Sequence, residues 1–262
     1  MIKHLTIITR QLLTYQYVLR QLVSQQIVLR YRRTILGYLW TLVNPLMMMS
    51  IMAVVFSTLF KADLVSFAIF LFAGMIPWNF FNSMVAQSST SFIQNEGLIK
   101  KIYIPKIVFP FSTAVALIID SMLSFVALFI IILAIGGPLS WAVLFLPISF
   151  LLLFIFSLGV GLTVSILTVF FRDLQYVVGI ALQGLFFLTP VLYKPESLGG
   201  RVAWIIQINP IVPFIDLFRT PLYLGHLPSV QTISSACLFA FFSLGIGLLI
   251  FIKQEKSIVF RL

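Results

Sequence analysis

Long apolar stretches, separated by short polar or proline-containing segments, dominate the chain from residue 35 onward. A helix needs roughly 20 apolar residues to cross a hydrocarbon core of about 30 Å. A closed β-barrel would alternate lipid-facing and lumen-facing residues, whereas the stretch from Leu123 to Ile135 is continuously apolar. The expected fold class is therefore an all-α integral membrane protein. Its six predicted transmembrane helices lie near residues 35–60, 64–87, 107–135, 141–171, 174–193 and 230–252.

The first 34 residues follow another pattern, in which apolar side chains recur at alternating steps of three and four. This spacing predicts an amphipathic helix with an apolar stripe and basic flanks. Such a helix suits the headgroup plane of an anionic membrane leaflet, and packing on a partner protein is the alternative. The stripe consists of Leu5, Ile8, Leu12, Tyr15, Leu19 and Leu22.

Two connecting segments stand out by composition. Residues 95–105, between the second and third spans, are polar and basic, and they predict a short helix that ends before Pro105. The stretch 190–228 holds six of the 12 prolines, so it cannot form one straight helix. Because irregular backbone is not tolerated in contact with lipid, we expect short re-entrant helices there, shielded by protein or facing an aqueous vestibule. A long outer loop is the alternative.

The basic residues indicate how the chain is oriented in the membrane. It contains 17 Lys and Arg against seven Asp and Glu, a formal net charge of +10. With both termini in the cytoplasm, most of the basic residues are cytoplasmic, in agreement with the positive-inside rule. Because these residues flank apolar spans, they do not indicate binding of nucleic acid. Those left outside are Lys61, Lys194, Arg201 and Arg219.

The sequence offers little for catalysis. Its two histidines, His4 and His226, lie near opposite ends of the chain, the acidic residues are scattered, and Cys237 is the single cysteine. We therefore predict no catalytic residue and no metal site. The phosphate-binding pattern G-x-x-x-x-G-K-[ST] is absent from the sequence, so any use of ATP must come from a partner.

Polar, aromatic and glycine residues within the spans are the remaining candidates. Asp120 falls in the third span and is expected to face the bundle interior. There it is neutral or hydrogen-bonded to neighbouring hydroxyls, and the alternative is that it contacts a substrate or carries a proton. Six aromatic residues are expected at the outer end, as an interfacial belt or as a path on which sugars stack. They are Trp78, Phe80, Phe81, Tyr193, Trp204 and Tyr223. Close helix packing, inside the bundle or in a dimer, is expected at Gly159, Gly161, Gly179, Gly184, Gly245 and Gly247.

Four motifs, in this order, resemble the membrane subunit of the ABC-2 polysaccharide exporters, which move lipid-linked O-antigen, teichoic acid or capsule polymers. The first is LRYRRTILGYLWTLVNP, from Leu29 to Pro45, and the second is the polar loop 95–105. The third is FFRDL at 170–174, and the fourth is TPVLY at 189–193. The resemblance covers nearly the whole chain.

By this resemblance, residues 1–262 form a single transmembrane domain, and the polar loop is a coupling helix that sits in a groove of an ATPase. The coupling helix would consist of Asn95, Glu96, Gly97, Leu98, Ile99, Lys100 and Lys101. The other parts would be the interface helix (1–34), spans one to five (35–193), an outer gate (194–228), and span six with a cytoplasmic tail (229–262).

The resemblance also implies a location and partners. The subunit would work as a homodimer with two copies of an ABC ATP-binding subunit, in the bacterial inner (cytoplasmic) membrane. No cofactor is expected on this chain, because the partner ATPase would use ATP and Mg. Arg30, Arg32 and Arg33 are candidates for attracting the pyrophosphate of a lipid-linked glycan at the cytoplasmic face, although topology alone also explains them.

The function that follows is that of a permease subunit, which exports lipid-linked polysaccharide and is driven by ATP hydrolysis in a separate subunit. An ABC-2 exporter of drugs or other small lipophilic cargo is one alternative. An integral membrane lipid-glycan transferase is another, although it would need clustered acids, histidines or metal ligands near one face. An ion-coupled transporter is a further alternative, less favoured because neither a second intramembrane acid nor an inverted repeat is evident.

Overall fold

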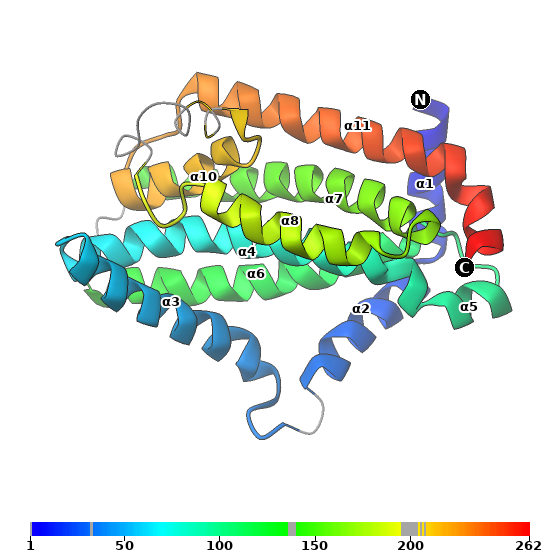
Figure 1. Ribbon diagram of the computed structural model, residues 1–262, viewed down its shortest axis with the longest axis horizontal. Helices are drawn as coiled ribbons and strands as arrows, with labels where there is room; N and C mark the ends of the chain where they lie inside the picture. Colours follow the sequence, from blue (N-terminus) through cyan, green and yellow to red (C-terminus); the bar gives the residue numbers. More distant parts are fainter. Residues whose placement is uncertain (1, 32–33, 136–139, 195–203, 205, 207) are drawn as a thin grey trace.

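Helices and connecting turns make up the protein, in a computed structural model that describes residues 2–31, 34–135, 140–194, 204, 206 and 208–262 (Figure 1). No β-strand occurs within these ranges. Five described helices are long and apolar enough to cross a bilayer, so the prediction of an all-α integral membrane fold is confirmed. They are α3 (Trp40–Leu59), α4 (Leu64–Gln94), α6 (Val108–Ile135), α7 (Leu146–Phe170) and α11 (Val230–Arg261).

The helix at the place of the fifth predicted span is short. This helix, α8 (Leu174–Leu188), is apolar but has only 15 residues. Its length is therefore about 22 Å, less than the hydrocarbon core of about 30 Å. The helix stops where Thr189 takes an extended backbone conformation before Pro190, because a residue that precedes proline is disfavoured in the helical region. The predicted end of this span at residue 193 is wrong.

Two other helices extend beyond the predicted spans. α4 continues past residue 87 to Gln94, and α11 continues past residue 252 to Arg261. The reason is that hydropathy marks only the apolar part of a helix, and polar final turns escape it. The start of α4 agrees with the prediction, since the Asp63 carboxylate accepts a hydrogen bond from the Ser66 N–H at 2.9 Å and caps the first turn.

The N-terminal region forms two helices, so the prediction of one continuous amphipathic helix is wrong. α1 (Ile2–Thr14) and α2 (Gln16–Tyr31) meet at Tyr15 and contact different parts of the bundle. α1 borders the segment that contains Tyr103, whereas α2 packs along α6. The Gln26 side-chain amide donates to the hydroxyls of Ser112 and Thr113 on α6, at 3.2 and 3.4 Å.

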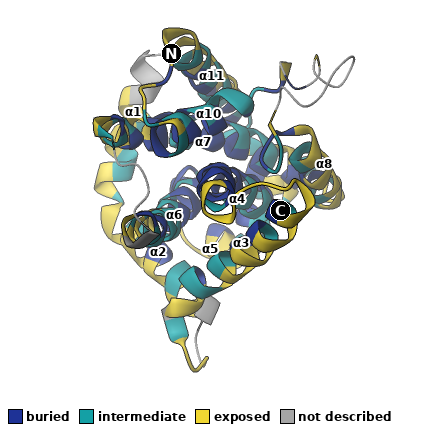
Figure 2. Cartoon of the chain, turned by 90° about the vertical axis from the view of Figure 1, so that its left-hand side faces the viewer, coloured by how far each residue is buried: buried dark blue, intermediate teal, exposed yellow. Residues whose placement is uncertain are grey.

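α4 occupies the centre of the bundle. It contacts α3, α6, α7, α8 and the short helix α10 (Val212–Arg219), and Figure 2 shows the other helices around it. Among the five long helices α4 is the most buried and α3 the least. On one side of the bundle, α2 and α3 diverge from each other (Figure 1). The α4 residues Asn79, Ser83 and Gln87 are only partly buried, and each lines a cavity that α3 or α2 also borders.

A close crossing joins α7 to α11 through glycines. A Cβ atom on Gly159 would lie 2.3 Å from the backbone carbonyl carbon of Ser243, and one on Gly247 would lie 2.4 Å from the Gly159 carbonyl oxygen. The Ser243 hydroxyl also donates to the Phe156 carbonyl oxygen at 2.8 Å. A Cβ on Gly161 would meet the Ser88 hydroxyl on α4. At these three glycines the predicted close packing is confirmed.

Close packing is not found at the other three glycines. Within the described part of the chain, a Cβ atom on any of them would meet nothing within 4 Å. Gly179, Gly184 and Gly245 therefore do not make the close packing within the bundle, and packing of these glycines in a dimer stays a prediction. Small residues permit close approach but do not show which face of a helix turns inward, so the sequence could not separate the two groups.

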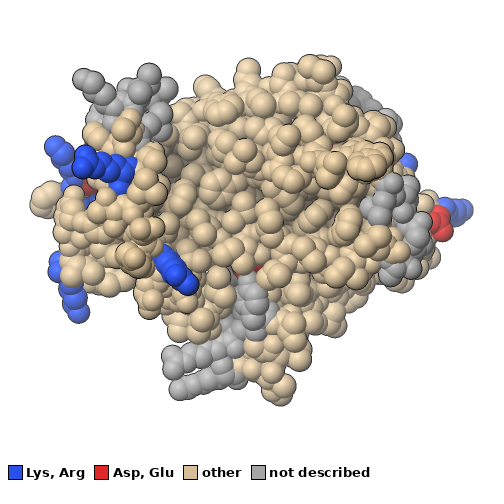
Figure 3. All heavy atoms as spheres, turned by 180° about the vertical axis from the view of Figure 1, so that it is seen from behind, with Lys and Arg blue, Asp and Glu red and all other residues tan. Residues whose placement is uncertain are grey.

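Most charged side chains lie at the two ends of the helices, and the broad band between them shows few charged atoms (Figure 3). We call the end that carries most of the positive charge the basic end. Its described residues include Lys100, Lys101, Lys106, Arg172, Lys253, Lys256 and Arg261. The Arg172 guanidinium donates to the Leu262 carbonyl oxygen at 3.1 Å, so the end of α7 and the chain terminus meet there. A band with few charges between charged ends suits a bundle embedded in a bilayer.

Candidate functional site

The polar loop at the basic end folds as the short helix α5 (Glu96–Lys101). Asn95 joins it directly to α4, and the Asn95 side-chain amide donates to the Ser91 carbonyl oxygen at 2.7 Å. Lys100 Nζ lies 2.6 Å from Glu96 Oε1, one helical turn away. The hydrogen bond and the positive charge of Lys100 hold the pKa of the Glu96 carboxyl below its usual value. Ile99 is buried and anchors the helix to the bundle.

The outward side of this segment combines charged and apolar groups. The exposed fraction is 36% for Leu98, 52% for Ile102 and 74% for Tyr103. The Lys106 ammonium lies 5.1 Å from the centre of the Tyr103 ring. Gly97 has open space beside it, since a Cβ there would meet nothing within 4 Å. A short helix that presents such groups at the end of a bundle can fill a groove on another protein.

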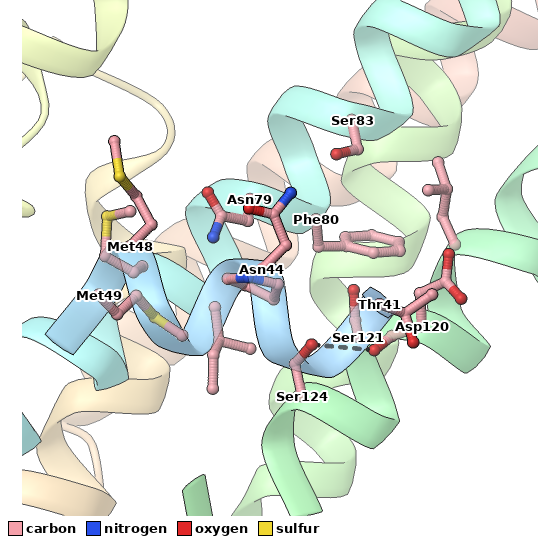
Figure 4. A pocket seen from close by; sticks show the side chains of 14 residues that line it. Thr41, Asn44, Met48, Met49, Asn79, Phe80, Ser83, Asp120, Ser121 and Ser124 are labelled. Carbon is pink, nitrogen blue, oxygen red and sulfur yellow. Dashed lines mark hydrogen bonds between the residues drawn. The ribbon is translucent and has the colours of Figure 1, made fainter. Parts of the chain in front are cut away.

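A cavity of about 320 Å³, lined by both polar and apolar side chains, lies between α3, α4 and α6 (Figure 4). Asp120 lines it from the middle of α6, and Asn79 lines it from the middle of α4. The Ser124 hydroxyl donates to the Asp120 carbonyl oxygen at 3.1 Å. Other polar residues that line the cavity are Thr41, Asn44, Ser83 and Ser121. Polar groups at this depth are costly in contact with lipid, so their concentration here indicates a functional surface.

A second polar cavity, of about 450 Å³, lies closer to the basic end, between α2, α4 and α6. Gln25 and Gln26 line it from α2, and Thr113 lines it from α6. From α4 and its end it is lined by Gln87, Ser91, Gln94 and Asn95. Leu29, one residue before Arg30, also borders this cavity.

One face of α4 connects the two cavities. Its lining residues recur at steps of four, four, four and three, which places them in a row along the helix. We call this row the polar stripe; it consists of Asn79, Ser83, Gln87, Ser91 and Gln94. The stripe is not among the candidates predicted from the sequence, although helical periodicity of polar residues within an apolar span was a usable signal.

Three of the predicted path aromatics lie deeper than expected. Trp78, Phe80 and Phe81 sit near the middle of α4 and are at most 4% exposed, so their predicted position at the outer end is wrong. The Trp78 ring lies 5.3 Å from Phe186 of α8, and the Phe81 ring stacks at 5.4 Å on Phe156 of α7. These rings fasten helices together because the face of α4 that carries them turns inward. Phe80 also borders the cavity that contains Asp120.

The other three path aromatics lie apart from this core. Tyr223 meets Phe70 edge-on at 5.4 Å, and the Tyr193 hydroxyl donates to the Phe187 carbonyl oxygen at 2.8 Å. The side chain of Trp204 is 65% exposed. The six predicted path aromatics therefore do not form one cluster in the described structure.

The proline-rich segment inserts a short helix into the bundle. α10 is followed by one π-helical turn, η4 (Thr220–Leu224). Phe214 of α10 stacks on Phe156 of α7 at 4.5 Å. The buried Arg219 guanidinium lies 3.8 Å from the Phe70 ring centre and donates to the Val191 carbonyl oxygen at 3.1 Å. α10 thus ties α4 and α7 to the chain that follows α8.

Part of the predicted lipid-entry site lies beyond what the structure describes. Arg32 and Arg33 are outside the described residues, as is the segment 195–203 of the predicted gate. Arg30 belongs to the last turn of α2. Within the described ranges, no group of three or more His, Cys, Asp or Glu residues could hold a metal ion.

Comparison with known proteins agrees with this architecture. Residues 17–223 match the family model described as ABC-2 type transporter. The O-antigen export system permease protein RfbA of Klebsiella pneumoniae is 30% identical over 234 residues, which cover 88% of this chain and 90% of that protein. Its namesake from Myxococcus xanthus is 29% identical over 226 residues, covering 86% and 87%.

A relative with a different named cargo matches over the same extent. The polysialic acid transport protein KpsM of Escherichia coli is 27% identical over 237 residues, covering 88% of this chain and 90% of that protein. The family match therefore runs from α2 through α5 to the inserted helix α10, and is not confined to one motif.

Proposed function

Because the chain belongs to the ABC-2 type transporter family, we propose that it is the permease subunit of an ABC transporter that exports lipid-linked polysaccharide across the bacterial inner membrane. The observation that carries this proposal is the likeness, over 86–88% of the chain, to proteins named for O-antigen export and polysialic acid transport. A multi-pass bundle with polar cavities at mid-depth suits a transport path.

In this proposal the energy comes from a separate ATP-binding subunit, present in two copies, which uses ATP and Mg. α5 is the docking element for that subunit, because it is exposed at the basic end while buried Ile99 and its junction with α4 anchor it. Asn95 ends α4 and begins α5, so a displacement of α5 is transmitted directly to the central helix. ATP binding would shift the bundle between two arrangements, and hydrolysis would reset it.

The working form in this proposal is a homodimer, with the path at the seam between two copies. α3 and α8 support it, because α3 is little covered by its own chain and α8 exposes Ile180 and Phe187. Gly179 and Gly184 leave open space on α8 for close approach by a second chain. The polar stripe supports the homodimer too, since lipid is an unfavourable neighbour for its amide and hydroxyl side chains.

The basic end is cytoplasmic in this proposal, with both chain termini there. Loading of the cargo would begin at Arg30, Arg32 and Arg33, where guanidinium groups attract the pyrophosphate of the lipid carrier. Arg30 follows directly on Leu29, a residue that lines the second cavity, so an anchored head group would leave its glycan close to that cavity.

Depletion of the protein in its host tests the proposed function. The expected result is loss of polysaccharide from the cell surface together with accumulation of lipid-linked polysaccharide at the cytoplasmic face. Polymer missing from both pools would instead favour a biosynthetic transferase. Unchanged pools would favour export of small lipophilic cargo, and either of these results contradicts the proposal.

A further inference from the structure

α1 has two faces with different surroundings. Ile8, Leu12 and Tyr15, which belong to the predicted apolar stripe, pack against the buried core. Elsewhere on the same helix, Ile7 is 51% exposed and Leu13 is 65% exposed. Figure 1 shows α1 running across the direction of the long helices, at the basic end. A helix in this orientation that also exposes apolar side chains suits the plane of the membrane surface.

A cavity of about 340 Å³ lies between α1 and the segment that follows α5. The side chains around it that can donate hydrogen bonds are those of Arg10, Gln11, Thr14 and Tyr103. Ile7 and Pro105 add apolar surface to the same cavity. No aspartate or glutamate occurs among the described residues that line it. This mixture of donors, positive charge and apolar surface fits an amphiphile with an anionic head group.

Two positive charges border the cavity. The Arg10 side chain is exposed, and within the described part of the chain no hydrogen bond or ion pair holds its guanidinium. Lys106 Nζ lies 5.1 Å from the centre of the Tyr103 ring, so a second cation stands beside the lining. Guanidinium groups pair well with phosphate oxygens, and each basic residue near an anionic leaflet adds to the attraction.

The cavity is separate from the arginines proposed to load the cargo. Tyr15, which also lines it, directly precedes α2, whereas Arg30 belongs to the last turn of α2. The helix between them is about 22 Å long, more than a pyrophosphate group can span. A carrier lipid held at Arg30 therefore leaves this cavity to a different occupant.

We propose that the cavity binds the phosphate head group of an acidic phospholipid from the cytoplasmic leaflet, and that this lipid strengthens coupling. Arg10 pairs with a phosphate oxygen, Gln11 and Tyr103 donate hydrogen bonds to the same group, and the first carbons of an acyl chain lie against Ile7. The orientation rests on the proposed function, which places the basic end in the cytoplasm. Because the cavity joins α1 to the chain directly after α5, a bound lipid ties the docking helix to the membrane surface.

Binding is measured on the purified complete transporter in neutral detergent, by native mass spectrometry with phosphatidylglycerol as the probe and phosphatidylcholine as the reference. We expect the wild type to retain phosphatidylglycerol preferentially and Arg10→Gln to bind it about fivefold more weakly. Arg20→Gln is the matched control, because Arg20 is an exposed arginine of α2 that does not line the cavity. Its affinity should stay within twofold of the wild type. Wild-type affinity in Arg10→Gln, or an equal loss in Arg20→Gln, would overturn the inference.

Competition with a polyprenyl phosphate distinguishes a phospholipid from the carrier lipid of the cargo. An equimolar amount should leave most of the phosphatidylglycerol bound to the wild type. Displacement of most of the phosphatidylglycerol would assign the cavity to the carrier lipid and overturn the inference.

Vesicles with and without phosphatidylglycerol test the effect on coupling. We expect the acidic lipid to raise glycan transport per ATP hydrolysed by about fivefold in the wild type and in Arg20→Gln, but not in Arg10→Gln. Equal transport per ATP in both kinds of vesicle would overturn the coupling role. If neither vesicle shows glycan transport although phosphatidylglycerol binds as expected, the proposed function fails and the lipid site stands.

Discussion

Single residues decide how closely the helices of this bundle approach one another. At Gly159 and Gly247 the backbones of α7 and α11 lie too close for a side chain on either glycine. Elsewhere large aromatic side chains keep helices apart and fill the space, as Phe156 does between Phe81 and Phe214. The bundle therefore alternates backbone contacts with layers of stacked rings.

Replacement of Gly247 by alanine is expected to destabilise the protein by about 1–3 kcal/mol, because the added methyl group overpacks the crossing. Its Cβ would lie 2.4 Å from the Gly159 carbonyl oxygen. The thermal unfolding midpoint in detergent measures the effect. Gly245→Ala, two residues away on α11, meets nothing within 4 Å and should change stability by less than about 0.5 kcal/mol. Equal midpoints for both variants would contradict this account of the crossing.

At this scale, the sequence allowed only part of the site to be predicted. It showed that Trp78, Phe80 and Phe81 are aromatic and lie within a span, but not that they face the interior, because orientation depends on which neighbours surround α4. The polar stripe was readable from its spacing, and averaging hydropathy over a whole span concealed it. Asn79 and Gln87 are apparent only when the faces of the helix are considered separately.

Among the elements, the junction between α4 and α5 matters most for function. The six residues of α5 carry little stability of their own, since isolated helices of this length are marginal in water. The Glu96–Lys100 pair and buried Ile99 hold the helix in place. Because the junction is a single residue, Asn95, an exposed docking element is connected to the core helix without a linker.

A charge reversal on α5 should uncouple ATP hydrolysis from export. Glu96→Lys removes the ion pair with Lys100 and places a positive charge on the docking surface. We expect export to fall by about tenfold, which corresponds to about 1.4 kcal/mol, while ATPase activity of the assembled complex persists. Glu255→Lys, on α11 at the same end, is the control and should export normally. Normal export by an assembled Glu96→Lys complex would remove α5 from the coupling role.

Element boundaries were predictable where a residue imposes them. Asp63 caps the start of α4, and Pro190 limits the end of α8, both through local backbone chemistry. The polar extensions of α4 to Gln94 and of α11 to Arg261 were not predictable from hydropathy, because they lie outside the apolar stretch. The break between α1 and α2 depends on what each helix contacts, which the sequence does not state.

At the scale of the whole molecule, an apolar bundle with charged ends surrounds a central helix that is polar on one side. The basic end brings together α5, the end of α7 and the chain terminus. The opposite end carries the turn between α3 and α4. In the proposed function, docking and cargo loading take place at the basic end and release at the opposite end, with the polar stripe between them.

The role of the three arginines in cargo loading can be tested separately from the total positive charge of the basic end. Replacement of Arg30, Arg32 and Arg33 by glutamine should raise the substrate concentration needed for half-maximal export by about tenfold or more, because charge-assisted hydrogen bonds to pyrophosphate are lost. A variant with glutamine at Lys253, Lys256 and Arg261 loses equal charge at the same end and should load normally. Equal loading by the two variants would mean that the arginines set the orientation of the chain in the membrane and do not bind the cargo.

The most direct test of the central claim is transport by the purified chain with its ATP-binding subunit in sealed vesicles that contain lipid-linked polysaccharide. The quantity measured is the amount of glycan that reaches the membrane face opposite the ATPase. We predict that ATP and Mg produce this movement, and that it stops when hydrolysis is blocked or when this chain is omitted. Glycan that stays on the ATPase side while ATP is consumed, or that crosses equally without this chain, would contradict the account.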